Sequence, residues 1–173
     1  MIEAVRRAVA DRVDWIQLRE KHLAARSLAE LARTVIHIAR SGRTKVLINS
    51  RIDVAIACGA DGVQLPGDSL PVATVRSIAP RDWLIGVSAH TLEEAHAAQS
   101  DGANYVLFGP VFESISKQGY GSKQGLETLR WVCNHMTIPV LALGGVTMEN
   151  SASCIDSGAA GVAGISLFQR SEV

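Results

Sequence analysis

The sequence predicts an α/β fold, a (β/α)₈ barrel that is shortened at both ends. Seven short apolar runs alternate with amphipathic segments, and each run is rich in Val, Ile and Leu, as parallel strands buried on both faces are. A Gly-Ala pair recurs before three of these runs, and polar residues follow the ends of most of them. Strands that alternate with helices in this way imply a parallel sheet with right-handed crossovers. We expect one domain over residues 1–173.

The predicted strands number one fewer than a complete barrel requires. They are 13–18, 46–49, 62–65, 84–88, 105–109, 140–144 and 161–167. Residues 1–12 are predicted to be helical, and residues 166–173 leave no room for a full final helix. We therefore expect a barrel that lacks the first strand and most of the last helix. A doubly wound open sheet is the alternative, but no Gly-x-Gly-x-x-Gly follows a strand near the N-terminus.

Four helices have start signals. Ser-x-x-Glu at 27–30 and Thr-x-x-Glu at 91–94 are predicted capping boxes, in which the hydroxyl and the carboxylate each accept a backbone N–H. Ser69 is predicted to cap a helix that carries Pro71 near its start, and Thr147 to cap a helix beginning near Met148.

The Gly-Ala pairs at 59–60, 102–103 and 158–159 each follow a predicted helix and precede a strand. A glycine there can end the helix through a left-handed turn, and the alanine can pack beneath the strand. Three occurrences in phase predict repeated helix-to-strand units.

Composition excludes several classes of protein. Seventeen basic residues balance 17 acidic ones, so the basic excess typical of nucleic-acid binding is absent. No apolar run approaches the roughly 20 residues of a membrane span, and residues 1–7 do not resemble a secretory signal. The three cysteines lack a Cys-x-x-Cys pair. We expect a cytoplasmic protein, with reduced and mostly buried cysteines, that binds neither nucleic acid nor membrane.

The chemistry of a barrel lies at the carboxyl ends of its strands. Gln17, Arg19 and Lys21 alternate at the first strand end, so we expect all three to point to one side. Two cations and an amide suit an anionic ligand, most simply a phosphate; ordinary surface ion pairs are the alternative. Asn49, Asp68, Ser88 and His90 lie at or after the next strand ends.

Two further segments suggest phosphate binding. Residues 112–125 form the longest stretch without periodicity, and such a loop can close over an anion; a plain surface loop is the alternative. Gly144 and Gly145 end the sixth strand, and Gly164-Ile165-Ser166 is expected on the seventh. Glycines there let backbone N–H groups approach a phosphate at a helix N-terminus.

Five ordered motifs resemble the thiamin phosphate synthase family, which includes the thiazole tautomerase (TenI-type) branch. They are Gln17-Leu18-Arg19-Glu20-Lys21, Leu47-Ile48-Asn49, Gly86-Val87-Ser88-Ala89-His90-Thr91, Phe108-Gly109-Pro110-Val111-Phe112 and Leu143-Gly144-Gly145-Val146. The resemblance covers nearly the whole chain and implies a (β/α)₈ TIM barrel. In the synthases, a pyrimidine diphosphate loses its diphosphate and a thiazole phosphate nitrogen captures the resulting cation.

The resemblance implies roles for individual residues. Gln17, Arg19, Lys21 and Asn49 would hold the pyrimidine diphosphate, and Ser88 would lie beside the pyrimidine. Ser114, Ser116 and Lys117 would close on the diphosphate. The thiazole phosphate would be bound through backbone groups of Gly144, Gly145, Ile165 and Ser166. The candidate catalytic residues are His90, Ser88 and Lys117.

The family's magnesium ligands are not retained. The synthases carry aspartates where this chain has Ser50 and Ser69, and Asp68 lies one residue away from the ligand position. A hard dication prefers carboxylate oxygens, so we expect no metal or cofactor, or Mg²⁺ only in a true synthase, with Asp68 as the one weak candidate ligand.

The sequence Gln64-Leu65-Pro66 resembles the tautomerase branch, whose proton shift needs a general acid-base but no metal. That branch has a histidine where this chain has Pro110, so His90 would have to replace it. We expect a thiazole-phosphate-binding protein of the tautomerase branch, an isomerase. A thiamin phosphate synthase, a transferase, and a non-catalytic ligand-binding relative are the alternatives. A shortened barrel would expose strand edges, so we also expect a homo-oligomer.

Overall fold

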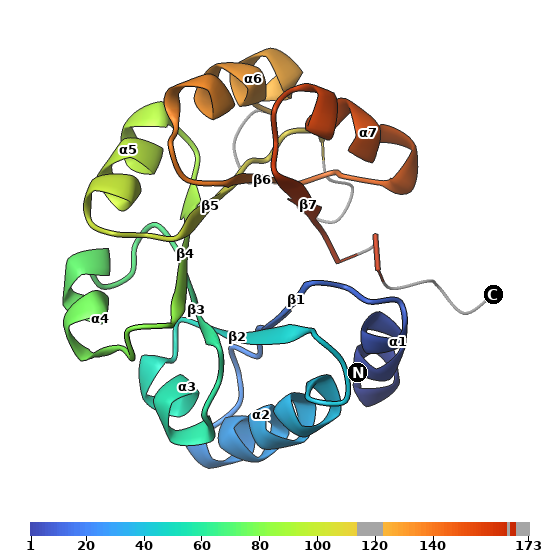
Figure 1. Cartoon of the computed structure of the whole chain (residues 1–173), viewed down its shortest axis with the longest axis vertical. Helices are drawn as coiled ribbons and strands as arrows, with labels where there is room; N and C mark the ends of the chain where they lie inside the picture. Colours follow the sequence, from blue (N-terminus) through green and yellow to red (C-terminus); the bar gives the residue numbers. More distant parts are fainter. Residues whose placement is uncertain (114–122, 166, 169–173) are drawn as a thin grey trace. The chain divides into compact units, whose positions relative to one another are not determined.

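The computed structural model describes residues 1–113, 123–165 and 167–168. Contacts divide the chain into two compact units, residues 1–85 and 86–173, called here the first and the second unit. Figure 1 shows both units with their helices and strands labelled. Each unit is described by itself.

The first unit is built from β/α repeats after an N-terminal helix. Its strands β1, β2 and β3 pair in parallel in that order, and α2 and α3 lie along one face of them (Figure 1). The elements are α1 (Ile2–Ala10), β1 (Trp15–Leu18), α2 (Ala25–Ala39), β2 (Lys45–Asn49), α3 (Ile52–Cys58), β3 (Gly62–Leu65) and α4 (Val72–Ile78).

The second unit continues the same alternation. Strand β4 begins at the end of the first unit, and β4, β5, β6 and β7 pair in parallel in chain order. The elements are β4 (Leu84–Ala89), α5 (Leu92–Ser100), β5 (Tyr105–Phe108), α6 (Gly125–His135), β6 (Val140–Leu143), α7 (Met148–Asp156) and β7 (Gly161–Ala163). All seven predicted strands and the helix predicted at residues 1–12 are therefore present.

Apolar strands and helix faces form the core of each unit. Strands β3 and β5 are buried at every residue, which explains their nearly continuous apolar sequences. In the second unit, Phe108 and Val106 of β5 pack in one cluster with Leu129 and Val132 of α6. This packing holds the carboxyl ends of the strands in place.

The Gly-Ala pairs have the predicted structural role. Gly59, Gly102 and Gly158 end their helices with φ of +65°, +93° and +95°, a region that glycine occupies without steric cost. The alanine after each glycine is only 5% exposed, so it packs beneath the following strand as expected.

Two of the predicted helix caps are confirmed. Thr91 accepts the Glu94 N–H through its hydroxyl at 3.2 Å, and Thr147 is the N-cap of α7. The cap predicted at Ser27 is wrong: α2 begins at Ala25, because the Leu28 N–H already bonds to the Ala24 carbonyl.

The cap predicted at Ser69 is also wrong. The Ser69 N–H donates to the Pro66 carbonyl in a turn, and α4 begins three residues later at Val72. Pro71 itself occupies the N-cap position, where its missing N–H is not needed.

The seventh strand is shorter than predicted. It ends at Ala163, and a bond from the Phe168 N–H to the Ile165 carbonyl marks a turn after it. Gly164 and Ile165 therefore follow the strand instead of lying on it. Cys154 is buried, Cys58 and Cys133 are half-buried, and all three are free thiols. Among the helices described, none has the length and apolarity to cross a membrane.

Candidate functional site

A pair of amide side chains lies at the carboxyl ends of β1 and β2 in the first unit. Gln17 Nε2 donates to Asn49 Oδ1 at 2.9 Å. Asn49 Nδ2 in turn donates to the Ser50 hydroxyl at 2.9 Å. The chain of bonds fixes both amide groups, so the Gln17 oxygen remains as an acceptor at a known place.

Gln64 lies on the same face as these amides. Gln17 is beside Leu47 in the register of β1 and β2, and Asn49 is beside Gln64 in that of β2 and β3. Since side chains alternate along a strand, Leu47 and Asn49 share one face, and their neighbours lie there too. Gln64 is only 1% exposed. Its polarity at the end of an apolar run marks it as a strand-end hydrogen-bonding group, although it is not among the candidate site residues named from the sequence.

Arg19 and Lys21 are exposed beyond the end of β1. The strand ends at Leu18, so strand alternation no longer determines where their side chains point. Within the part of the chain that the structure describes, neither side chain forms an ion pair. Their charges are therefore available to an anion.

The positions of the family's magnesium ligands do not form a carboxylate site. Ser50 has φ of +60° and its hydroxyl already accepts from Asn49, while Asp68 is exposed. Arg51 donates to both carboxylate oxygens of Asp53, at 2.9 and 2.6 Å, and this hydrogen bonding lowers the pKa of Asp53.

Among the described residues no group of three or more His, Cys, Asp or Glu side chains could hold a metal. Mg²⁺ requires hard oxygen ligands, usually including one or two carboxylates. The donor set around Ser50 does not fit this ion.

In the second unit, Ser88 and His90 lie at the carboxyl end of β4, on either side of the strand's last residue, Ala89. Ser88 is half-buried beside Leu107 of β5, and His90 lies just beyond the strand. The His90 ring bonds through Nδ1 to the Gly109 carbonyl, and its backbone N–H donates to Glu94 Oε2 at 2.6 Å. Because a carbonyl only accepts, Nδ1 must carry the proton.

Residues 109–113, which we call the strap, run from the end of β5 along the end of β6. Backbone N–H groups of Val111 and Phe112 donate to the carbonyls of Leu143 and Gly144, both at 2.9 Å. A Cβ atom on Gly144 would lie 2.6 Å from Pro110. The glycine is therefore required by close packing against the strap.

Gly144 and Gly145, which we call the glycine corner, have φ of +92° and +64°. Their N–H groups make no hydrogen bond to any residue that the structure describes. On the far side, Asn150 Nδ2 donates to the Gly145 carbonyl at 2.9 Å, and the Thr147 N–H donates to Asn150 Oδ1 at 2.8 Å. The corner thus presents unbonded amides beside the N-terminus of α7, which suits an anion.

The remaining candidate residues are less well defined. Ile165 is 69% exposed in the turn after β7. Ser114, Ser116, Lys117 and Ser166 lie outside the described residues. Glu113 and Lys123, which flank residues 114–122, form an ion pair at 3.4 Å.

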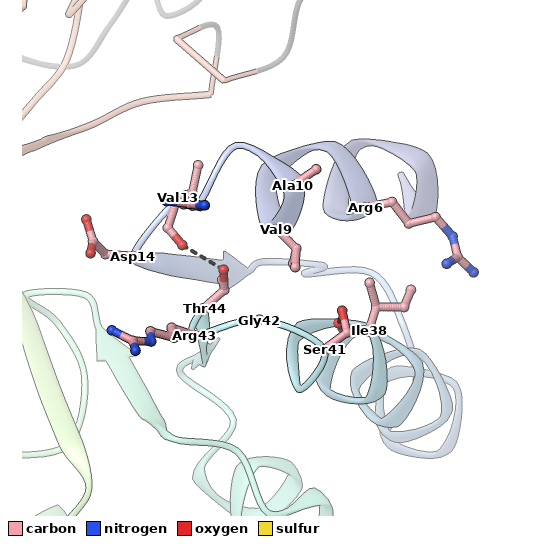
Figure 2. Close-up of a pocket in the computed structure, with 11 residues that line it drawn as sticks. Arg6, Val9, Ala10, Val13, Asp14, Ile38, Ser41, Gly42, Arg43 and Thr44 are labelled. Carbon is pink, nitrogen blue, oxygen red and sulfur yellow. Dashed lines mark hydrogen bonds between the residues drawn. The ribbon is translucent and has the colours of Figure 1, made fainter.

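A cavity lies at the opposite end of the first unit's strands, away from their carboxyl ends. It has a volume of about 820 Å³ and lies between α1, the end of α2 and the start of β2. Figure 2 shows Val9, Val13 and Ile38 at this cavity, while the guanidinium groups of Arg6 and Arg43 point away from each other. Since the predicted site residues lie at the strands' carboxyl ends, this cavity is separate from them.

Comparisons with known proteins agree with this geometry. The sequence profile of the family described as thiamine monophosphate synthase matches residues 1–168. Thiamine-phosphate synthase from Moorella thermoacetica is 40% identical over 165 residues, covering 95% of this chain and 79% of that protein. The synthase from Methanoregula boonei is 42% identical over 164 residues, covering 95% and 76%.

A solved structure is similar along nearly the whole chain. Thiamine phosphate pyrophosphorylase from Pyrococcus furiosus matches with a TM-score of 0.87 and 34% identity, covering 95% of this chain and 79% of that one. The match confirms the predicted fold class, a TIM-barrel-like α/β fold. It also supports the resemblance found from the five motifs.

Proposed function

The chain belongs to the thiamine monophosphate synthase family, and from this we propose that it is a thiamine-phosphate synthase. In this reaction the C–O bond between the pyrimidine methylene and the diphosphate breaks, and the diphosphate leaves with the electron pair. The thiazole nitrogen lone pair then forms the C–N bond. Neither substrate is oxidised or reduced.

The amide pair of Gln17 and Asn49 carries this proposal. A tautomerase acts on a thiazole alone and has no use for a second heterocycle site. Here two oriented amides in the first unit supply the donors and acceptors that a pyrimidine edge needs. Relatives about 40% identical, named thiamine-phosphate synthase, support the same choice.

The diphosphate would be held by cations of the first unit. Arg19 and Lys21 are exposed and lack ion pairs within the described part of the chain. An arginine can bond two phosphate oxygens at once, whereas a lysine acts as a point charge. Their charge would stabilise the leaving group as negative charge develops on it. Lys117, with Ser114 and Ser116, would also close on the diphosphate.

The thiazole phosphate would bind at the glycine corner. Its oxygens would accept from the N–H groups of Gly144 and Gly145, which no described residue uses, and the backbone of Ile165 and Ser166 would complete the contacts. Ser88 would contact the pyrimidine from β4.

The described residues of the first unit supply no carboxylate pair that would hold Mg²⁺ beside the diphosphate. The hydroxyl of Ser50 is bonded to Asn49 and Asp53 is paired with Arg51, while exposed Asp68 has no partner among the described residues. These residues would leave charge neutralisation to cationic side chains and to whatever ion the diphosphate itself binds.

The tautomerase reading has less support. Pro110 has no group that can move a proton, so His90 would have to act as the base. One observation favours that role: with Nδ1 protonated toward Gly109, neutral His90 has a lone pair on Nε2. A non-catalytic relative that binds thiazole phosphate tightly is the third candidate. Cytoplasmic location and self-association also stay predictions.

Three assays on the same purified protein separate these candidates. Incubation with pyrimidine diphosphate and thiazole phosphate, with and without Mg²⁺, is expected to yield thiamin phosphate and diphosphate. Isomerisation of the thiazole carboxylate phosphate, followed by absorbance, should stay at background. Calorimetric binding of thiazole phosphate with neither product would overturn the synthase proposal in favour of a binding protein.

A further inference from the structure

His90 is held at two points, although it lies at the exposed end of β4. Its backbone N–H donates to the Glu94 carboxylate, and Glu94 in turn donates its own N–H to Thr91. The ring bonds through Nδ1 to the Gly109 carbonyl. An exposed histidine without such bonds could change rotamer freely. In His90 a bond to the backbone N–H and a bond to the ring both restrict the residue.

The bond to Gly109 determines the chemistry of the ring. Nδ1 must be the protonated nitrogen of the neutral form, and it is also protonated in the imidazolium. The donor to Gly109 is therefore present in both charge states. The ring can therefore hold the Gly109 carbonyl whether or not Nε2 carries a proton.

The carbonyl that His90 bonds belongs to Gly109, the first residue of the strap. A Cβ atom at Gly109 would lie 2.0 Å from the Leu143 carbonyl oxygen, so strand β6 touches the strap at its start. Two residues later, the strap bonds to the carbonyls of Leu143 and Gly144. At its far end, Glu113 O would lie 2.4 Å from a Cβ atom on Gly145.

We infer that His90 is a positioning residue for the glycine corner. Its Nδ1–H fixes the Gly109 carbonyl, the strap passes along β6, and the strap's contacts set the direction of the Gly144 and Gly145 N–H groups. This role rests on the proposed binding of thiazole phosphate at that corner. The ring itself touches no substrate, so His90 controls affinity for the thiazole phosphate and leaves the chemical step alone.

Two amide substitutions distinguish positioning from base catalysis. In His90→Asn the side-chain Nδ2 occupies nearly the place of the ring Nδ1 and can donate to Gly109. In His90→Gln the amide instead reaches toward the place of Nε2. His90→Ala removes both ring nitrogens. His96→Ala, on the exposed side of α5, is the matched histidine control.

The first measurement does not depend on activity. Hydrogen exchange of the Val111 and Phe112 amides reports the strap directly, because these groups donate to β6 and the corner. His90→Ala and His90→Gln should accelerate both exchange rates about tenfold, as expected for the loss of one hydrogen bond. His90→Asn should restore the slow rates, and His96→Ala should not change them.

The second measurement is steady-state kinetics of thiamin phosphate formation. His90→Ala should raise the KM for thiazole phosphate about tenfold with little change in kcat, and His90→Asn should restore the KM. If His90→Asn loses kcat as severely as His90→Ala, the ring acts as a base and the inference is wrong. If the exchange results hold but no thiamin phosphate forms, the proposed function fails and the positioning role stands. Unchanged exchange in His90→Ala would overturn the inference whatever the activity.

Discussion

Gln17 and Asn49 lie 32 residues apart in the chain, yet a 2.9 Å hydrogen bond joins their side chains across β1 and β2. The bond exists because parallel pairing brings the ends of the two strands together. Asn49 Nδ2 also donates to the Ser50 hydroxyl at 2.9 Å. The two amides therefore act as one oriented unit.

Gln17→Ala should impair binding of one substrate only. We expect the KM for pyrimidine diphosphate to rise about tenfold, since an oriented hydrogen bond is lost and Asn49 is freed to rotate. The KM for thiazole phosphate should not change. Gln99→Ala is the matched control: its amide oxygen accepts from the backbone of Thr137 and Ile138, so its loss should lower stability without affecting either KM.

Gly145→Ala should be far more damaging than Gly102→Ala. Both glycines have positive φ, but a Cβ atom at 145 would lie 2.7 Å from Phe112 Cβ, whereas nothing lies within 4 Å of one at 102. We expect a loss of about 1 kcal/mol in the free energy of unfolding at 102 from backbone strain alone. At 145 overpacking adds about 1–3 kcal/mol.

Urea unfolding of the two variants measures this difference. Calorimetry should also show that Gly145→Ala binds thiazole phosphate weakly while Gly102→Ala binds it normally. Equal stability losses would mean that the strap does not pack on the corner as described.

Ser50→Asp combined with Ser69→Asp should create a Mg²⁺ site that we do not expect in the natural chain. Aspartate tolerates the left-handed backbone at position 50 better than most residues do, and two carboxylates supply the oxygens that Mg²⁺ prefers. Titration with Mn²⁺, followed by electron paramagnetic resonance, should show a site in the double variant only. Ser77→Asp, on α4, controls for added charge; tight Mn²⁺ binding by the unaltered chain would contradict the expectation.

Thr91→Ala and Ser27→Ala test the corrected helix starts. The Thr91 hydroxyl accepts the Glu94 N–H, so its loss should lower the free energy of unfolding by about 1 kcal/mol. Ser27 lies inside α2, where alanine is at least as favourable, so stability should not fall. Chemical denaturation measures both, and a clear loss in Ser27→Ala would restore the cap originally predicted there.

The buried phenol of Tyr105 should lower the free energy of unfolding at high pH. Burial raises its pKa above the ordinary value, so the folded state keeps the phenol neutral. Stability is unaffected below about pH 10, the ordinary pKa, and falls as the pH rises above it because the unfolded chain ionises more readily. Between pH 9.5 and 11, about one unit around that pKa, Tyr105→Phe should lose less stability than the unaltered protein in denaturation experiments. Identical plots of stability against pH for the two proteins would contradict this assignment.

Local features of the sequence predicted much of the fold. Short apolar runs gave the seven strands, and the glycines at 59, 102 and 158 ended their helices as expected, since both signals depend on residues close in the chain. The start of α2 was missed because Ser27 has the right neighbours for a cap, while the turn from Ala24 already continues the helix. The end of β7 was missed because apolar residues continue past Ala163 into a turn.

The sequence by itself determined the order of strands and helices, and through five motifs it determined the family. Both are properties of neighbouring residues, which a linear pattern records. Only the tertiary structure decided that Gln64 shares a face with Asn49, that Gln17 bonds to Asn49, and that the His90 ring bonds to the Gly109 carbonyl. These contacts join residues at or just after the ends of different strands, whose register follows from packing of the whole unit.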